Sequence, residues 1–371
     1  GFISGYVAAK ELSQGQEDAK YYEDDFLGSL VQKECSKTFD IYSPNPPTYS
    51  MMMLPFIALD YQWAKVIWVI VSFTLLLVSC KIISNNYPGR FKFSDLIILI
   101  LLFQPVYVNL RMGQNYLFLL FLLTIIWDGW KNDRSFLAGL SLALMAVFKL
   151  GVIWLWPLLL LSGKWKILLI SACMVVLFIA VSYPFLGFDA WITFFDQVAE
   201  VANKPSSAVT AYQSIPSFFK HLFTYDTHWN PYPVFVSTFM GEYFLKALIF
   251  SLILGSLILG YFSKNIDLKV SLAAVISVIT SPLALDYHYA LLLLPSIAVL
   301  ANFQGGNSKK ASYLLVAGIL LISLPFPYTS EILGKGIIAV FAYPKLYGGL
   351  ILLIFIFIAI RREIISRKII Q

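Results

Sequence analysis

The sequence predicts an all-α protein, a polytopic transmembrane helix bundle, and three observations lead to that fold class. Hydrophobic residues make up 59% of the 371-residue chain, charged residues make up 13%, and the mean hydropathy is +0.76. A soluble fold of this size could not bury so much apolar surface. Eleven apolar runs follow one another along the chain, and basic residues gather in alternate connections between them.

Each apolar run approaches the roughly 20 residues that a helix needs to cross a bilayer, and shorter runs suffice where neighbouring helices shelter them. The run at 152–163 is short and contains Pro157, so we expect a re-entrant segment there. The eleven predicted segments cover residues 63–83, 94–108, 115–128, 135–150, 152–163, 165–183, 240–262, 268–282, 286–303, 311–325 and 337–360.

Lysines and arginines divide unequally between the two sets of connections. One set, which includes the C-terminal Arg361-Arg362-Glu363 stretch, holds fifteen basic residues against five acidic ones, while the other holds 12 basic and 16 acidic residues. The positive-inside rule makes the first set cytoplasmic. The N-terminal segment, the 184–239 connection and the turns at 109–114, 283–287 and 326–336 then share the extracytoplasmic side.

These assignments divide the chain into four regions. Residues 1–61 form an extracytoplasmic N-terminal loop, 62–183 a first transmembrane bundle, 184–239 a second extracytoplasmic loop, and 240–371 a second bundle with a cytoplasmic C-terminus. Both loops mix aromatic and polar residues, which is typical of helices that lie along the membrane interface. Because the chain begins with glycine and a polar segment, we expect a further membrane span upstream of Gly1.

Several function classes do not fit this pattern. The net charge of +6 comes from basic clusters that membrane topology explains, so we exclude nucleic-acid binding. The cysteines at 35, 80 and 173 lack the spacing of a disulfide framework or a zinc site. Nothing resembles a Walker loop or a dinucleotide fingerprint, so a soluble nucleotide donor is not expected. We predict neither a metal site nor a cofactor.

Ionisable residues at the outer ends of the spans are the candidates for chemistry. Lys149 follows the apolar run from Leu137 to Phe148, so its ammonium needs a counter-charge or a wet cavity, and an anionic ligand would serve. A lysine at the membrane interface is the alternative. Arg111 lies in the connection Arg111-Met112-Gly113-Gln114-Asn115, where it is either a snorkelling arginine or a ligand contact.

A third candidate segment runs from Ser281 to Tyr289, where Pro282 breaks a helix and Asp286 and His288 stand two residues apart. His288 is either a packing histidine or a group that donates to an oxyanion or transfers a proton. The two other histidines, His221 and His228, fall in the polar 184–239 loop and are expected to be ordinary surface residues.

We expect Arg111, Lys149 and His288 to converge on one depth of the bundle, although they are far apart in the sequence. A phosphodiester or pyrophosphate leaving group needs cationic donors in a low-dielectric pocket, because charge develops on its oxygens as the bond breaks. A pocket that opens to lipid would suit a substrate with a phosphate head and a long apolar tail.

At these residues the chain resembles glycosyltransferase family 87, a group of GT-C type membrane enzymes that includes polyprenol-phosphate-mannose-dependent mannosyltransferases. The resemblance covers nearly the whole chain, and its most specific part is the Gly-Gln-Asn turn followed by the lysine within the membrane. The residues that carry it are Tyr6 to Leu12 with Gly15 and Tyr22, Pro44 to Pro47 with Leu54 and Pro55, Arg111 to Asn115, Ala138 and Gly139 with Lys149 and Pro157, Tyr212 to Ile215, and Ser281-Pro282 with Asp286 and His288.

The resemblance implies a GT-C type bundle with interfacial helices in the outer loops. It implies transfer of a hexose, by family default mannose, from a polyprenyl-phosphate sugar to a hydroxyl of a lipid or glycan acceptor, with inversion. The donor, the acceptor and membrane lipids are the implied partners, and neither metal nor nucleotide is needed. The implied location is the plasma (inner) membrane, with an active site that faces the extracytoplasmic side.

Roles carried over from the family fall on eight residues. Arg111, Lys149 and His288 are predicted to bind the donor phosphate. Asp286 is predicted to orient His288 or to bind a sugar hydroxyl, and Tyr287 to line the pocket or to pack between helices. Hydrogen bonds to sugar or phosphate are assigned to Gln114, Asn115 and Gln213.

The general base of the family is an aspartate in the first outer loop, and here the sequence departs from the family pattern. That aspartate would stand immediately before Tyr6, yet residues 1–5 contain no acid. We therefore expect the base upstream of Gly1, with Asp24, Asp25 or Asp286 as substitutes.

Two other functions compete with this interpretation. An O-antigen polymerase or ligase would also handle lipid-linked glycans, but it would need a longer outer loop with more arginine and histidine. A secondary transporter would use Lys149 and Asp286 as coupling charges, but it would show two related halves with polar residues at mid-depth. We find no such repeat in the sequence.

Overall fold

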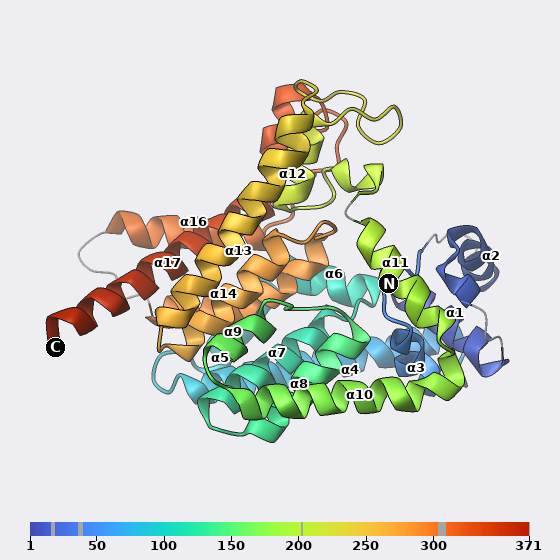
Figure 1. Ribbon diagram of the computed structural model, residues 1–371, viewed down its shortest axis with the longest axis horizontal. Coiled ribbons are helices and arrows are strands. Elements are labelled where there is room, and N and C mark those ends of the chain that lie inside the picture. Colours follow the sequence, from blue (N-terminus) through green and yellow to red (C-terminus); the bar gives the residue numbers. More distant parts are fainter. Residues whose placement is uncertain (16–18, 36–39, 202, 303–308, 371) are drawn as a thin grey trace. The chain divides into compact units, whose positions relative to one another are not determined.

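The computed structural model describes residues 1–15, 19–35, 40–201, 203–302 and 309–370, with the side chains of 19 and 368–370 left aside. Within these ranges the protein is 76% helix and has no strand (Figure 1), so the all-α prediction is confirmed. The chain forms two compact units. Unit 1 comprises Gly1–Ser79, Asn109–Gly151 and Lys166–Ala202, and unit 2 comprises Cys80–Val108, Val152–Trp165 and Asn203–Gln371.

Three of the described helices are long and apolar enough to cross a membrane. They are α4 (Tyr61–Asn86), α10 (Trp165–Leu186) and the continuous helix Phe239–Phe262, which begins with the π-helical turn η4 (Phe239–Phe244) and continues as α13 (Leu245–Phe262). Large apolar side chains on these helices are exposed, for example Val176 at 67% and Phe250 at 66%. Exposed apolar surface on long helices is typical of contact with lipid.

All eleven predicted segments fall on helices, but fewer than eleven qualify as spans. The predicted span 94–108 is broken into α5 (Phe93–Leu101) and α6 (Gln104–Met112), which are bent by 70° and would make a fourth span if counted together. The short segment with Pro157 is the seven-residue helix α9 (Leu155–Leu161). Other predicted segments are α7 (Tyr116–Lys131), α8 (Ser135–Phe148), α14 (Ile266–Ile279), α15 (Leu293–Asn302), α16 (Lys309–Ser323) and α17 (Pro344–Ile370).

The N-terminal part of unit 1 packs as a small aromatic core. Helix α1 (Phe2–Ser13) contacts α2 (Asp24–Glu34) and α3 (Thr48–Met53). The 3-10 turn η1 (Ala19–Tyr22) lies between α1 and α2, and η2 (Leu54–Phe56) follows α3. The residues from Phe2 to Ala9 are all buried, so most of α1 is enclosed. In the rest of unit 1, α7 packs against α8.

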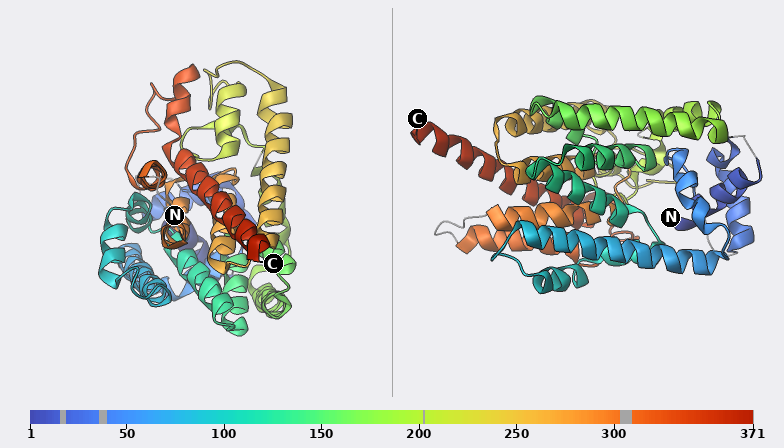
Figure 2. Two further views of the ribbon diagram at one scale, coloured as in Figure 1. Left: turned by 90° about the vertical axis from the view of Figure 1, so that its left-hand side faces the viewer. Right: turned by 90° about the horizontal axis from the view of Figure 1, so that it is seen from below.

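In unit 2 the most enclosed helix is α14, which contacts α13, α15 and α17. Helices α16 and α17 lie side by side (Figure 2). They approach closely because Gly348 of α17 faces α16, where a Cβ on Gly348 would stand 2.5 Å from the Gly318 carbonyl oxygen. The chain enters α15 through the 3-10 turn η5 (Asp286–Leu292) and enters α17 through η6 (Gly336–Ala342).

Helices also form in the predicted outer loop: α11 (Asp189–Val201) in unit 1, and η3 (Pro205–Ala208) and α12 (Ile215–Phe223) in unit 2. The prediction that His221 is a surface residue is wrong, because α12 turns it inward. The His221 side chain is buried, with Nδ1 2.6 Å from the Ala208 carbonyl oxygen and Nε2 3.1 Å from that of Gly334. His228 is exposed, as expected.

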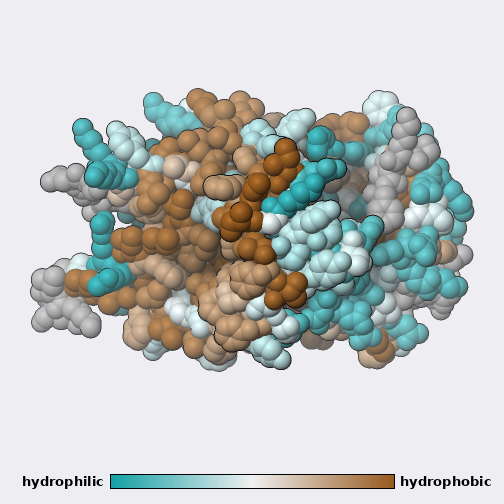
Figure 3. Space-filling model, turned by 90° about the horizontal axis from the view of Figure 1, so that it is seen from above, coloured by the Kyte–Doolittle hydropathy of each residue, from teal (hydrophilic) through white to brown (hydrophobic). Residues whose placement is uncertain are grey.

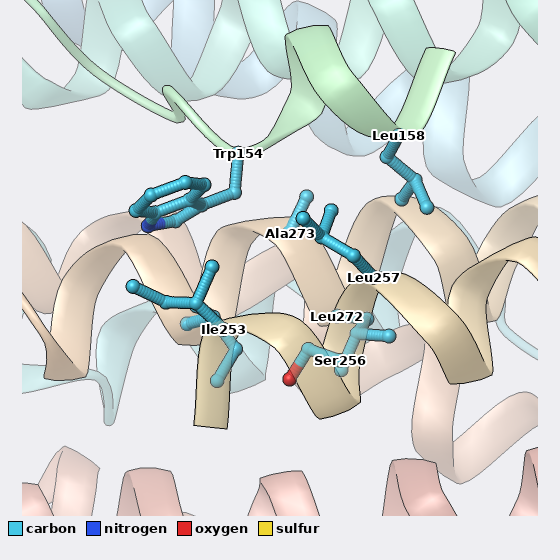
Figure 4. Close-up of a pocket in the computed structure, with 8 residues that line it drawn as sticks. Trp154, Leu158, Ile253, Ser256, Leu257, Leu272 and Ala273 are labelled. Carbon is cyan, nitrogen blue, oxygen red and sulfur yellow. The ribbon is translucent and has the colours of Figure 1, made fainter. Parts of the chain in front are cut away.

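Apolar surface is extensive on the face in Figure 3, where many side chains are brown. Within unit 2, α9, α13 and α14 leave a small apolar crevice between Trp154, Ile253, Ser256 and Leu272 (Figure 4). Its volume of about 10 Å³ is at the limit for one water molecule, and its lining carries no ionisable group. The chemistry must therefore lie elsewhere.

Candidate functional site

Lys149 directly follows α8 and has an extended backbone conformation. The helix ends at Phe148, and Lys149 follows as its C-cap with φ −167° and ψ 128°. The Lys149 ammonium donates a hydrogen bond to Asn45 Oδ1 at 2.5 Å and lies 5.8 Å from the ring centroid of Tyr116. None of the described carboxylates forms an ion pair with it. Its hydrogen-bond partner is thus a neutral amide.

Asn45 is fixed by tyrosines of the N-terminal core. Its Nδ2 donates to the Tyr42 carbonyl oxygen at 2.6 Å, and its own carbonyl oxygen accepts from the Tyr22 hydroxyl at 2.7 Å. Burial raises the pKa of the Tyr22 and Tyr42 hydroxyls, so both stay protonated donors. The Thr48 hydroxyl donates to the carbonyl of Val147, which ties this loop to the end of α8.

The connection from Arg111 to Asn115 is a tight turn between α6 and α7. Gly113 has φ +67°, and a Cβ there would stand 2.8 Å from Phe2 Cβ, so the position requires glycine. Trp68 Nε1 donates to the Gly113 carbonyl oxygen at 3.0 Å. Gln114 is buried, and Arg111 is exposed at the end of α6.

Asn115 has an unusual environment. It is the N-cap of α7 and is 1% exposed, but neither its Nδ2 nor its Oδ1 has a hydrogen-bond partner among the described residues. A buried amide that is left unpaired costs about 1–3 kcal/mol. Such a group is favoured where a ligand supplies the missing hydrogen bonds.

Two charged residues near the unit 1 site, Asp40 and Lys65, were not among the predicted site residues. Asp24 and Asp25 are exposed in the first turn of α2, whereas Asp40 lies close enough for its charge to act on Lys149. Lys65 faces the Gly113 turn, with its Cε 3.6 Å from the place that a Gly113 Cβ would occupy. Asp40 did not stand out in the sequence because it interrupts no apolar run, and Lys65 did not because it is only the third residue of the predicted span 63–83.

Unit 2 contains a second buried cation, Lys345, at the start of α17. Its side chain is 0% exposed, and its ammonium donates to Gln104 Oε1 at 2.7 Å and to the carbonyl oxygens of Ile322 at 2.8 Å and Leu324 at 3.4 Å. Asp286 Oδ1 lies 3.8 Å from the same nitrogen. Gln104 also donates from Nε2 to Asp286 Oδ2 at 3.1 Å, so it bridges the two charges.

Gln213 is fully buried and lies beside this cluster. Its Nε2 donates to the carbonyl oxygens of Thr210 at 2.8 Å and Ala342 at 2.7 Å, and its Oε1 accepts from the Lys345 backbone nitrogen at 3.3 Å. Both amide hydrogens are therefore used within the protein. Gln213 links the predicted outer loop to the start of α17.

His288 is half-buried in η5, and its ring stacks on that of Tyr287 with centroids 4.7 Å apart. Its Nδ1 accepts a hydrogen bond from the Leu285 backbone nitrogen at 3.1 Å. A ring nitrogen that accepts carries no proton, so the neutral imidazole of His288 has its hydrogen on Nε2. Nε2 is then a donor, which suits an anionic oxygen.

The eight predicted site residues form two groups. Unit 1 brings together Arg111, Gln114 and Asn115 in one turn and holds Lys149 beside Tyr116, the residue after that turn. Unit 2 links Asp286 to Gln213 through Lys345 and holds Tyr287 and His288 in the same 3-10 turn. Because Arg111 and Lys149 belong to one unit and His288 to the other, the convergence of these three cations stays a prediction.

Comparison with known protein families decides the class of protein. The model described as glycosyltransferase family 87 matches residues 44–282, which is more than half of the chain. The chain belongs to glycosyltransferase family 87. No curated protein and no solved structure matches it. Membership, together with the apolar helices, makes the protein a membrane glycosyltransferase that takes a sugar donor and an acceptor.

The family 87 match covers one of the two groups more fully than the other. Asn45, the turn from Arg111 to Asn115, and Lys149 lie inside it. Gln104 and Gln213 of the unit 2 cluster also lie inside it, but Asp286, His288 and Lys345 follow its last residue. The unit 2 cluster of this family 87 glycosyltransferase is thus defined by its own contacts.

Lys345 and Gln104 are the residues of the unit 2 cluster that the sequence analysis missed. Both lie within predicted spans, at 337–360 and 94–108. Lys345 breaks an apolar run as Lys149 does, so the rule for ionisable residues within the membrane would have found it. Gln104 gave a weaker signal because an uncharged amide near the end of a span is common.

Proposed function

We propose that the chain transfers a hexose, by family default mannose, from a polyprenyl-phosphate sugar to a hydroxyl of a lipid or glycan acceptor. The reaction takes place on the extracytoplasmic side of the plasma (inner) membrane, with inversion at the anomeric carbon. The observation that carries the proposal is the Lys149 ammonium, which in a family 87 glycosyltransferase has a neutral amide as its hydrogen-bond partner. A phosphate oxygen of the donor supplies a charged hydrogen-bond partner for that ammonium.

The chemistry needs cations but no redox change. The bond between the anomeric carbon and the donor phosphate oxygen breaks, and its electron pair stays on that oxygen. A new bond forms from the acceptor oxygen to the anomeric carbon, and the acceptor proton passes to a carboxylate on the extracytoplasmic side. Positive groups next to the phosphate stabilise the charge that develops there, and they act most strongly where water is excluded.

The residues take the following roles in this proposal. Lys149, Arg111 and the Nε2–H of His288 bind the phosphate. Asn115, whose buried amide has no partner among the described residues, donates to the donor from Nδ2, and Gln114 lies next to it. Tyr287 lines the site through its stacking on His288.

The test is a transfer assay on the full-length protein in lipid vesicles, with radiolabelled polyprenyl-phosphate mannose or glucose and a membrane lipid extract as acceptor. We expect labelled sugar on the acceptor and release of polyprenyl phosphate, faster with mannose than with glucose. His288→Ala lowers the rate without a loss of folded protein on size-exclusion chromatography. Donor that is recovered intact would overturn the proposal, and uptake into vesicles without a covalent product would favour a transporter.

A further inference from the structure

The 3-10 turn that carries His288 is held by contacts from three other segments: the side chains of Gln104 and Lys345 and the backbone of Gln213. Residues three apart in a 3-10 helix lie on the same face. Asp286 and Tyr289 are three apart, both are buried, and both point into unit 2: Asp286 toward Gln104 and Lys345, and the Tyr289 hydroxyl onto the Gln213 carbonyl oxygen. This arrangement turns the half-buried His288 toward another face.

The backbone before the turn is fixed as well. The Gln213 backbone nitrogen donates to the Ala284 carbonyl oxygen at 2.7 Å, and the Leu285 nitrogen donates to His288 Nδ1. The Leu285 contact sets the imidazole tautomer, and it persists only while the turn keeps its geometry. The position of the His288 donor therefore depends on the contacts made by Ala284, Asp286 and Tyr289.

The charges of Lys345 and Asp286 differ in how well the protein pairs them. Lys345 has three hydrogen-bond acceptors, which equals the number of its hydrogens, in addition to Asp286 at 3.8 Å. Asp286 Oδ2 accepts from Gln104, but Asp286 Oδ1 is buried with no hydrogen-bond partner in the described part of the chain. The Asp286 carboxylate thus depends on the Lys345 ammonium for its charge balance. The ammonium itself keeps three neutral oxygen acceptors even without the carboxylate.

We infer that Lys345, Gln104 and Asp286 form a buried anchor that positions His288 for sugar transfer without touching the substrate. This inference rests on the proposed function, and it makes Asp286 a positioning residue rather than a catalytic carboxylate. The two roles rank the variants differently. A positioning role makes the loss of Lys345 worse than the loss of Asp286, and a catalytic role makes the loss of Asp286 worse. The reason is that a buried charge that loses its partner is costly, while removal of both charges is tolerated.

The test is a double-mutant cycle on transfer rate with Lys345→Met, Asp286→Asn and the double variant. We expect Lys345→Met to be worst, with a loss of about 100-fold in kcat, and Asp286→Asn to lose about 10-fold because Lys345 keeps its three acceptors. The double variant should recover most of the loss caused by Lys345→Met. Multiplication of the two single losses in the double variant would overturn the inference and return Asp286 to direct chemistry.

A second arm separates positioning from general stability. In a His288→Ala background, Asp286→Asn should cause no further loss of the residual rate, because its effect acts through His288; an undiminished further loss would overturn the inference. The exposed pair Lys246 and Glu242, whose charged atoms are 3.9 Å apart, provides the matched control. The variants Lys246→Met and Glu242→Gln should leave kcat unchanged, singly and together.

A third arm does not depend on catalysis or on Lys345→Met folding. Amide hydrogen exchange of the segment 284–292 in Asp286→Asn should be at least about tenfold faster than in the parent, since the turn loses a charged anchor. Exchange at the parental rate would overturn the inference. If the parent protein transfers no sugar but this exchange rises, the proposed function fails while the anchor is supported.

Discussion

Two buried lysines, one in each unit, make opposite use of their surroundings. Lys345 in unit 2 is fully enclosed and donates to three oxygens, with Asp286 at 3.8 Å. Lys149 in unit 1 donates to a single amide oxygen, that of Asn45, and also faces the ring of Tyr116. An ammonium has three hydrogens to share. Lys345 is therefore satisfied by the protein, and Lys149 has donor capacity left.

This difference separates a structural cation from one that is suited to a ligand. Both lie in apolar surroundings, where an ionised group without a partner is costly. The protein compensates that cost at Lys345 with its own acceptors, and a phosphate compensates it at Lys149 in the function we propose. The presence of a lysine within a membrane segment does not distinguish the two cases; the set of partners does.

The largest expected effect is on catalysis at Lys149. Replacement by methionine keeps the apolar stem and removes the charge, so we expect the rate of sugar transfer to fall by about 100-fold, as for loss of an electrostatic stabiliser of the transition state. The melting temperature of the purified protein in detergent should stay the same or rise, because a poorly paired ammonium is removed. Transfer assays and thermal unfolding measure the two effects.

Lys33→Met is the matched control for this variant, since Lys33 is an exposed lysine of unit 1 and should show neither effect. The comparison also predicts that Lys345→Met lowers the melting temperature, because it strands the Asp286 carboxylate. Equal effects of Lys149→Met and Lys345→Met on stability would remove the distinction between the two lysines.

The next largest effect is expected if Lys149 receives a carboxylate neighbour, as Lys345 has in Asp286. Asn45→Asp places a carboxylate at the hydrogen-bonding distance of 2.5 Å from the ammonium. That carboxylate competes with an anionic ligand, so we expect the KM for the donor to rise about tenfold, equivalent to about 1.4 kcal/mol. Asn45→Ala, which removes the hydrogen bond without adding charge, should raise KM less. A fall in KM for Asn45→Asp would contradict a phosphate site at Lys149.

The sequence predicted Lys149 and the helical fold because both are local signals. An ammonium that interrupts an apolar run is visible in the sequence, and the composition requires lipid as part of the solvent. The partners of a buried group are not local. Gln104 and Lys345 are 241 positions apart, and nothing near either residue indicates that they form a hydrogen bond.

The errors in the predicted elements have physical reasons too. The predicted span 94–108 is apolar enough to continue, but Pro105 occupies the second position of α6, where proline is accepted at the start of a helix and not in its middle. His221 was assigned to the surface from its polar neighbours. The structure buries it because backbone carbonyls of Ala208 and Gly334, remote from it in sequence, supply its partners.

A smaller effect on stability is expected at the turn before Asn115. Gly113→Ala introduces both a strained φ of +67° and a Cβ at 2.8 Å from Phe2 Cβ. Gly163 has the same φ of +67° with nothing within 4 Å, so Gly163→Ala isolates the strain. We expect Gly163→Ala to cost about 1 kcal/mol of unfolding free energy and Gly113→Ala about 1–3 kcal/mol more through overpacking. Equal unfolding free energies of the two variants would show that α1 shifts away from the new Cβ without loss of stability.

The smallest effect is a pH dependence at His221, in the unit 2 part of the predicted outer loop. Burial lowers the pKa of His221, and this outweighs the two backbone carbonyls that act in the opposite direction. As pH falls, the unfolded chain takes up its proton first, near pH 6.5, so stability is complete above that pH and is lost as pH drops through the lower folded pKa. We expect His221→Gln to flatten the fall in unfolding free energy between pH 7 and pH 5, because glutamine takes up no proton in either state. His228→Gln, at the exposed histidine, should leave the profile unchanged, and a His221→Gln profile as steep as the parent's would mean that other groups set the acid sensitivity.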